Sequence, residues 1–139
     1  MPVLHGIRVS SLYRTSPQDY PGQDDFLNLA VAGVWEGSPR ELLCTIQSVE
    51  TRYGRDRTRE IPKGPRTLDI DVELFGSCII GEPGLVIPHE RMHIRQFVLV
   101  PLLELFPDSA DPVSGRPYRE ICDSLPDQGV VKVGTLNGC

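Results

Sequence analysis

The segment Thr67–Phe75, TLDIDVELF, places an acid at every second position of an apolar run. Successive side chains of an extended strand point to opposite faces of its sheet. We therefore predict a strand over residues 67–75, with an apolar face that packs on helices. Its opposite face carries Asp69, Asp71 and Glu73. Because neighbouring carboxylates repel one another, this acidic face is either solvated or bound to cations.

Basic residues on both sides of this segment favour a cation site. Mg²⁺ prefers oxygen ligands and commonly takes one or two carboxylates together with substrate phosphates. The planar arginine guanidinium matches a phosphate group. We therefore predict that Asp69 and Asp71 bind divalent cations, with polyphosphate held between metal and guanidinium groups. The basic residues are Arg55, Arg57, Arg59, Lys63 and Arg66 before the acids, and His89, Arg91, His93 and Arg95 after them.

Two phosphate-binding motifs are absent from the sequence. It contains no G-x-x-x-x-G-K-[ST] loop and no glycine-rich loop of the protein-kinase type. Any nucleotide chemistry is therefore of another kind. Two metals that share carboxylates would clamp the attacking and bridging oxygens of a phosphoryl-type transfer.

Composition narrows the class of protein. The 139 residues fit one domain with a modest core, and 40% hydrophobic residues indicate a globular chain. The net charge of −5 argues against nonspecific binding to nucleic acid. The four cysteines lack zinc-site spacing, which favours reduced thiols. With no apolar run long enough to span a membrane and no signal-peptide pattern, we expect a cytoplasmic protein without a membrane partner.

Local patterns predict strands and helices in an order typical of the α+β class. β-branched and aromatic residues predict strands over 4–14 and 26–36 that pair antiparallel. Ser38 as N-cap, Pro39 at the first position and Glu41 in a capping box predict a helix that Gly54 ends. Further along we expect a hairpin-like turn, a loop with His89, a helix over 94–107 in which Pro101 marks a kink or the true start, a short helix near 117–124, and a strand near 129–133.

The segment Thr67–Phe75 and several other segments of the sequence resemble a known family. The segment GPRTLDIDVELFG resembles the signature of 6-hydroxymethyl-7,8-dihydropterin pyrophosphokinase (HPPK). Further segments are similar to HPPK in the same order: VSSLYRTSP, DDFLNLAV, QSVETRYGRDR and IPHERMHIRQFVLVPLLEL. The resemblance is strongest over residues 5–107 and implies a single domain over 1–139. It implies a ferredoxin-like, mostly antiparallel sheet with helices packed on it.

The resemblance also implies an activity and its residues. HPPK transfers pyrophosphate from ATP to the hydroxymethyl group of a reduced pterin and releases AMP. Two Mg²⁺ ions would be held by Asp69 and Asp71, and Arg55 and Arg66 would act in catalysis beside the phosphates. The ATP-binding positions would be Gln47, Glu50, Arg57, His89 and Arg95, and the pterin-binding positions Thr15, Ser16, Pro17, Gln18, Phe26, Asn28 and Phe97. Without the resemblance, Phe26 and Phe97 would be assigned to the core.

This chain departs from the family pattern at its start and within the acid run. It begins just ahead of the segment that matches the family's second strand, so we expect an N-terminally incomplete sheet, or one that a partner or a swapped segment completes. Glu73 stands where many members are apolar. It would either tune the metal site or face solvent further along the strand, and we expect the solvent-facing position. Three hypotheses therefore stay open: an active pyrophosphokinase, a binding-only or inactive remnant, and a metal-dependent phosphodiesterase.

Overall fold

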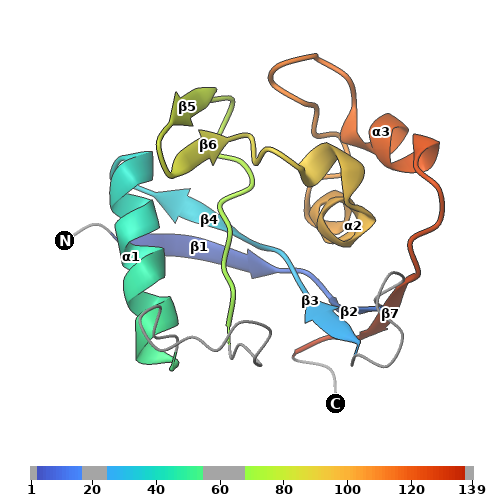
Figure 1. The fold of residues 1–139 in the computed structure, drawn as a ribbon, viewed down its shortest axis with the longest axis horizontal. Helices are drawn as coiled ribbons and strands as arrows, with labels where there is room; N and C mark the ends of the chain where they lie inside the picture. Colours follow the sequence, from blue (N-terminus) through green and yellow to red (C-terminus); the bar gives the residue numbers. More distant parts are fainter. Residues whose placement is uncertain (1–2, 17–24, 55–67, 137–139) are drawn as a thin grey trace. The chain divides into compact units, whose positions relative to one another are not determined.

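The computed structural model describes residues 3–16, 25–54 and 68–136 (Figure 1). The backbone contacts divide the chain into two compact units. The first unit consists of Met1–Val3 and Trp35–His89, and the second of Leu4–Val34 and Glu90–Cys139. Within the described residues, no helix is long and apolar enough to cross a membrane.

Each of the two strands predicted near the N-terminus is divided into two shorter strands. Residues 4–14 form β1 (Leu4–Val9) and β2 (Leu12–Thr15), and residues 26–36 form β3 (Phe26–Asn28) and β4 (Val31–Trp35). At the interruption, the Ser10 amide donates to the Ala30 carbonyl at 2.9 Å, and the Ala30 amide donates to Ser10 Oγ at 2.8 Å. These bonds satisfy the backbone where the ladder stops.

The four strands belong to two separate sheets, one on each side of that interruption. β1 pairs with β4, whose arrow runs in the opposite direction in Figure 1. β2 pairs antiparallel with β3, with Thr15 opposite Phe26. The predicted antiparallel pairing of these segments is therefore confirmed at β2 and β3.

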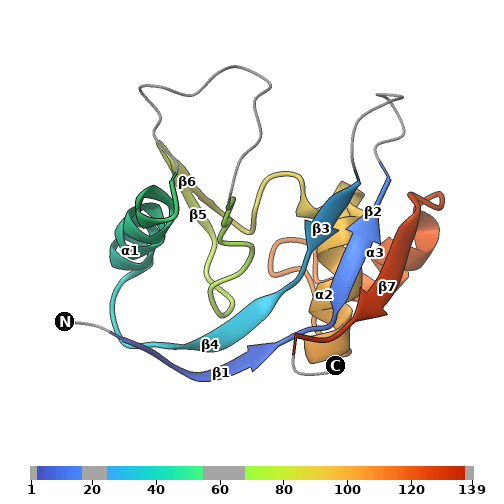
Figure 2. The same ribbon diagram turned by 90° about the horizontal axis from the view of Figure 1, so that it is seen from below.

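The C-terminal segment completes a three-stranded sheet. β7 (Val130–Gly134) pairs antiparallel with the other edge of β2, which gives the order β3-β2-β7. Helix α2 (Gln96–Leu105) lies against this sheet in Figure 2 and contacts all three strands. The strand predicted near 129–133 is confirmed, and the short helix predicted near 117–124 is α3 (Tyr118–Ser124).

Helix α2 is shorter than the predicted helix over 94–107. A single 3₁₀ turn, η1 (Met92–Ile94), precedes it, and Arg95 caps it with extended backbone angles. Pro101 lies inside α2, so the prediction that it marks the true start is wrong. Proline costs the helix one backbone hydrogen bond. Its ring is almost fully buried, and this apolar burial offsets the loss.

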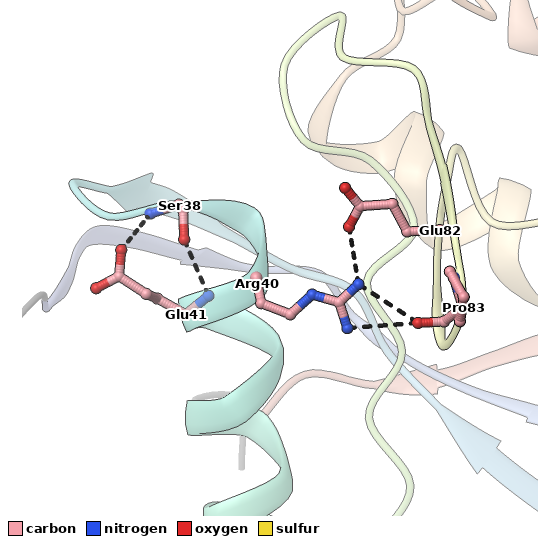
Figure 3. A network of polar contacts seen from close by, with 5 residues as sticks. All are labelled: Ser38, Arg40, Glu41, Glu82 and Pro83. Atoms are coloured by element: carbon pink, nitrogen blue, oxygen red, sulfur yellow. Dashed lines mark hydrogen bonds and ion pairs between the residues drawn. The ribbon is translucent and has the colours of Figure 1, made fainter.

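In the first unit, α1 (Pro39–Arg52) begins and ends as the sequence predicts. Ser38 Oγ accepts the Glu41 amide at 3.1 Å, and Glu41 Oε1 accepts the Ser38 amide at 3.0 Å (Figure 3). This is the predicted capping box. Gly54 follows the last turn with φ of 96°, a backbone conformation that side-chain-bearing residues rarely adopt and that is typical of helix ends.

A short hairpin forms the rest of the regular structure in this unit. β5 (Ile80–Glu82) and β6 (Leu85–Ile87) pair antiparallel across Pro83 and Gly84. The Arg40 guanidinium of α1 contacts a Glu82 carboxylate oxygen at 2.8 Å and the Pro83 carbonyl at 3.4 Å (Figure 3). The hairpin predicted after residue 75 is confirmed, and these contacts attach it to the start of α1.

The prediction of a strand over residues 67–75 is wrong for the residues that the structure describes. Thr67 lies outside the described residues, and residues 68–75 are not in a strand. None of the described strands pairs with them. An alternating sequence becomes a strand only where a neighbour accepts and donates its backbone hydrogen bonds. The α+β class with antiparallel pairing is confirmed, as three small sheets within the described residues.

Candidate functional site

The acid segment, residues 68–75, is held at two points of its backbone. The Ile70 amide donates to Glu50 Oε2 at 3.0 Å, and the His89 amide donates to the Glu73 carbonyl at 2.9 Å. Glu50 lies in the last turns of α1 and is only 4% exposed. The position of the acid segment is therefore set by α1 on one side and by the chain after β6 on the other.

Side chains of the acid segment alternate in exposure even without a strand ladder. Asp69 and Asp71 are exposed, whereas Ile70 and Val72 are half-buried. The predicted separation of acidic and apolar sides is therefore confirmed for these four residues. Glu73 differs, because it is half-buried. The expectation that Glu73 faces solvent is wrong.

Three potential metal ligands come together beside this segment. Among the described residues, Asp71, Glu73 and His89 each offer a ligand atom, and these atoms lie within 4.8 Å of one another. Asp71 is exposed, and Glu73 and His89 are half-buried. Asp69, the predicted partner of Asp71, is not in this group. The carboxylate oxygens fit Mg²⁺, whereas an imidazole nitrogen is a ligand for transition metals.

Gln47 and Glu50, which the resemblance assigned to ATP binding, lie in different environments on α1. Gln47 is exposed on α1 and lines a shallow depression with Cys44, Ser48 and Thr51. Glu50 is buried, and its carboxylate accepts the amide of Ile70, which lies between the two aspartates. Glu50 therefore positions the acid segment through the backbone of Ile70.

The described residues predicted to bind pterin lie in the second unit. Thr15 and Phe26 face each other across β2 and β3, and Asn28 lies two residues further along β3. Phe26 is 54% exposed, and Thr15 is 7% exposed. Thr15 Oγ1 is buried without a hydrogen-bond partner among the described residues. A buried hydroxyl in that state fits a site where a polar ligand supplies the partner. Ser16 follows β2 and is exposed.

The first turn of α2 carries two more predicted site residues. The Arg95 guanidinium lies 5.5 Å from the centroid of the Phe97 ring, a cation–π arrangement. Gln96, between them, exchanges hydrogen bonds with Gln128. Each backbone amide donates to the partner's side-chain oxygen at 2.9 Å. The sequence analysis did not find this pair, because its members lie 32 positions apart and no local pattern links them.

Glu104 holds the other end of α2 against β2. Its carboxylate accepts the Tyr13 hydroxyl at 2.6 Å and the Ser11 amide at 2.7 Å. Burial raises the pKa of Glu104, but the hydrogen bonds from Tyr13 and Ser11 outweigh it and hold the pKa below its usual range. Burial, reinforced by the hydrogen bond to Glu104, raises the pKa of Tyr13 to about 12. Sequence analysis also missed this contact between distant segments.

Five of the predicted site residues lie outside the described residues. They are Pro17, Gln18, Arg55, Arg57 and Arg66. The predicted roles of these residues in phosphate and pterin binding stay predictions.

The sequence matches known proteins over most of its length. The family model of 7,8-dihydro-6-hydroxymethylpterin-pyrophosphokinase (HPPK) matches residues 2–107. The 2-amino-4-hydroxy-6-hydroxymethyldihydropteridine pyrophosphokinase of Bacillus subtilis is 46% identical over 98 residues, which is 70% of this chain. The protein of the same name from Pseudomonas aeruginosa is 36% identical over 133 residues, which is 96% of this chain. The folic acid synthesis protein fol1 of Schizosaccharomyces pombe is 42% identical over 130 residues.

These relatives differ in how much of their own length is matched. The chain spans 18% of the fission yeast protein and 58% of the Bacillus protein. It spans 80% of the Pseudomonas protein.

Proposed function

Because this chain belongs to the 7,8-dihydro-6-hydroxymethylpterin-pyrophosphokinase family, we propose that it transfers pyrophosphate from ATP to 6-hydroxymethyl-7,8-dihydropterin. The hydroxymethyl oxygen attacks the β-phosphorus of ATP, and the hydroxyl proton is released to solvent. The bond from that phosphorus to the oxygen bridging the α-phosphate breaks, and AMP leaves. The names of the Bacillus and Pseudomonas relatives support this reaction. The name of the fission yeast relative, a folic acid synthesis protein, supports its place in folate synthesis.

The observation that carries the proposal is the acid segment. Asp69 and Asp71 are exposed on a backbone that Glu50 and His89 fix from two sides. Exposed carboxylate oxygens are the donors that Mg²⁺ prefers, so these residues fit the metal that the family implies. Bound Mg²⁺ would offset the negative charge of the triphosphate and of the group in transfer.

The other residues bind and orient the substrates. In the first unit, Gln47 and His89 are proposed to contact the nucleotide. In the second unit, Arg95 presents a guanidinium that matches a phosphate, beside the Phe97 ring. Phe26 offers an exposed aromatic face for a flat heterocycle, and Thr15 Oγ1 offers a buried hydroxyl. Holding the reacting atoms in line supplies a large part of the rate enhancement in such a transfer.

The reaction is tested by incubating the full chain with MgATP and the pterin and measuring nucleotide products. We expect AMP to appear only when the pterin is present, in equal amount with pterin diphosphate. The matched control is the 6-methyl analogue, which lacks the attacking hydroxyl and should release no AMP.

Three other outcomes would contradict the proposal. Formation of ADP would indicate transfer of a single phosphate. Nucleotide binding without AMP would indicate the binding-only hypothesis. Hydrolysis of a phosphodiester without pterin would indicate the phosphodiesterase hypothesis.

A further inference from the structure

The group of Asp71, Glu73 and His89 differs in chemistry from a pair of magnesium-binding aspartates. It combines an imidazole nitrogen with two carboxylate oxygens. Mg²⁺ binds oxygen ligands and keeps several waters, whereas imidazole suits zinc, copper, iron and nickel. Three protein ligands of this kind also match the number found in catalytic zinc sites, which keep a fourth position open.

The spacing of the three ligand atoms is compatible with one shared ion. A zinc ion bound at about 2.1 Å from each ligand in tetrahedral geometry places the ligand atoms roughly 3.4 Å apart. The three atoms already lie within 4.8 Å of one another. Closing the remainder requires a shift of at most about 1.4 Å per pair, which small side-chain rotations supply.

The backbone holds two of the ligands together independently of any metal. The His89 amide donates to the Glu73 carbonyl at 2.9 Å, so these two residues stay adjacent although they are far apart in sequence. The bond from the Ile70 amide to Glu50 fixes the chain just before Asp71. Preorganised ligands lose less conformational freedom when an ion binds. Asp71 is exposed and gives the ion access from solvent.

We propose that Asp71, Glu73 and His89 bind one transition-metal ion of the Zn²⁺ class in the absence of nucleotide. The ion takes two carboxylate oxygens and one imidazole nitrogen from the protein, and water or an added ligand occupies its remaining position. This site differs from the proposed magnesium pair because it uses Glu73 and His89 and does not require Asp69. It concerns metal binding alone, so its outcome is separate from that of the pyrophosphokinase assay.

The test uses the full chain without nucleotide, with its accessible thiols alkylated because Cys44 and Cys78 are exposed. Zn²⁺ affinity is measured by competition with a chromogenic chelator, and ligation is followed by the visible absorption of bound Co²⁺. We expect one ion per chain. Glu73→Gln and His89→Gln should each weaken binding by about tenfold or more and change the Co²⁺ spectrum.

Two matched variants control for binding to any acidic or imidazole group. Asp69→Asn removes the neighbouring acid outside the group, and His93→Gln removes an exposed imidazole elsewhere. Both should keep the affinity within roughly threefold of the unmodified chain. Circular dichroism before titration establishes that each variant is folded. The proposal is overturned if folded Glu73→Gln and His89→Gln proteins bind Zn²⁺ as well as the controls, or if Asp69→Asn loses as much affinity as they do.

Discussion

The two units of this protein bury their side chains in different ways. In the second unit, Met92, Leu99 and Tyr118 are each at most 1% exposed. Among the described residues of the first unit, the buried apolar side chains are Leu85 and Ile87, and the buried residue of α1 is the acid Glu50. The second unit is therefore stabilised mainly by apolar burial, and the first relies more on polar contacts.

This difference explains where the candidate metal ligands occur. Residues that bind ligands are drawn from regions with few buried apolar contacts, because binding requires access and adjustment. Glu104 in the second unit accepts two hydrogen bonds from the protein and serves as an anchor. Asp71 in the first unit is exposed and gathers with Glu73 and His89. A carboxylate is thus structural or ligand-binding according to the partners around it.

The largest expected effect comes from a cavity in the second unit. Leu99 is 0% exposed, and Leu99→Ala should lower the free energy of unfolding by about 3 kcal/mol, because buried methyl groups and their packing are lost. Urea denaturation measures this change. The control is Ile79→Ala in the first unit, where the side chain is 63% exposed and the loss should stay below about 0.5 kcal/mol. Similar losses for both variants would remove the distinction between the units.

A smaller effect is expected from the anchor between α2 and β2. Tyr13→Phe removes the hydroxyl that donates to Glu104 at 2.6 Å. Because hydrogen bonds to charged groups contribute more than neutral ones, the variant should lose about 1.5 kcal/mol of unfolding free energy. Unchanged stability would show that Glu104 does not anchor the helix through this bond.

The same anchor predicts a dependence on alkaline pH. The folded pKa of Tyr13 is raised from 10.0 to about 12, so the unfolded chain releases this proton first. The contribution of Tyr13 is therefore full below pH 10 and is lost as pH rises toward about 12. The unfolding free energy of the native chain minus that of Tyr13→Phe should fall across this range. A constant difference would contradict the raised pKa.

In the first unit, the capping box is expected to contribute about as much as an ordinary helix cap. Ser38→Ala removes the oxygen that accepts the Glu41 amide and should lower the unfolding free energy by about 1 kcal/mol. Ser48→Ala, in the same helix but away from its start, is the matched control and should change stability less. Thermal melts followed by circular dichroism compare the two. Equal losses would mean that the cap is not a specific contribution.

The smallest effect is expected at the surface. Arg40 and Glu82 form an ion pair at 2.8 Å, with side chains 47% and 55% exposed. Solvent weakens such a pair, so Arg40→Gln should lose no more than about 0.5 kcal/mol, and the loss should shrink in high salt. Urea titrations at low and high salt test this. A salt-independent loss would show that Arg40 acts through packing instead of charge.

Features with a local physical cause could be predicted from the sequence. Ser38, Glu41 and Gly54 act within one turn of the helix end they define, and the structure confirms all three. The exposure of Asp69 and Asp71 follows from alternation and is likewise confirmed.

Features that depend on distant residues could not be predicted. The strand over 67–75 requires a neighbouring strand, which a local pattern does not supply. The partial burial of Glu73 and the burial of Glu50 depend on contacts made after folding, and so does the pairing of Gln96 with Gln128. The predicted site therefore contained Asp71 and His89 but excluded Glu73, which the structure places with them.

The central claim is that Asp69 and Asp71, the exposed acids of the acid segment, serve catalysis and do not stabilise the fold. The most direct test is the Asp71→Asn protein, assayed for pterin-dependent AMP release and for its melting temperature. Because Asp71 is exposed, the melting temperature should be essentially unchanged, while AMP release should fall by at least about 100-fold. Glu82→Gln, another exposed acid of the same unit, should retain activity. If Asp71→Asn releases AMP as fast as Glu82→Gln, the claim is contradicted.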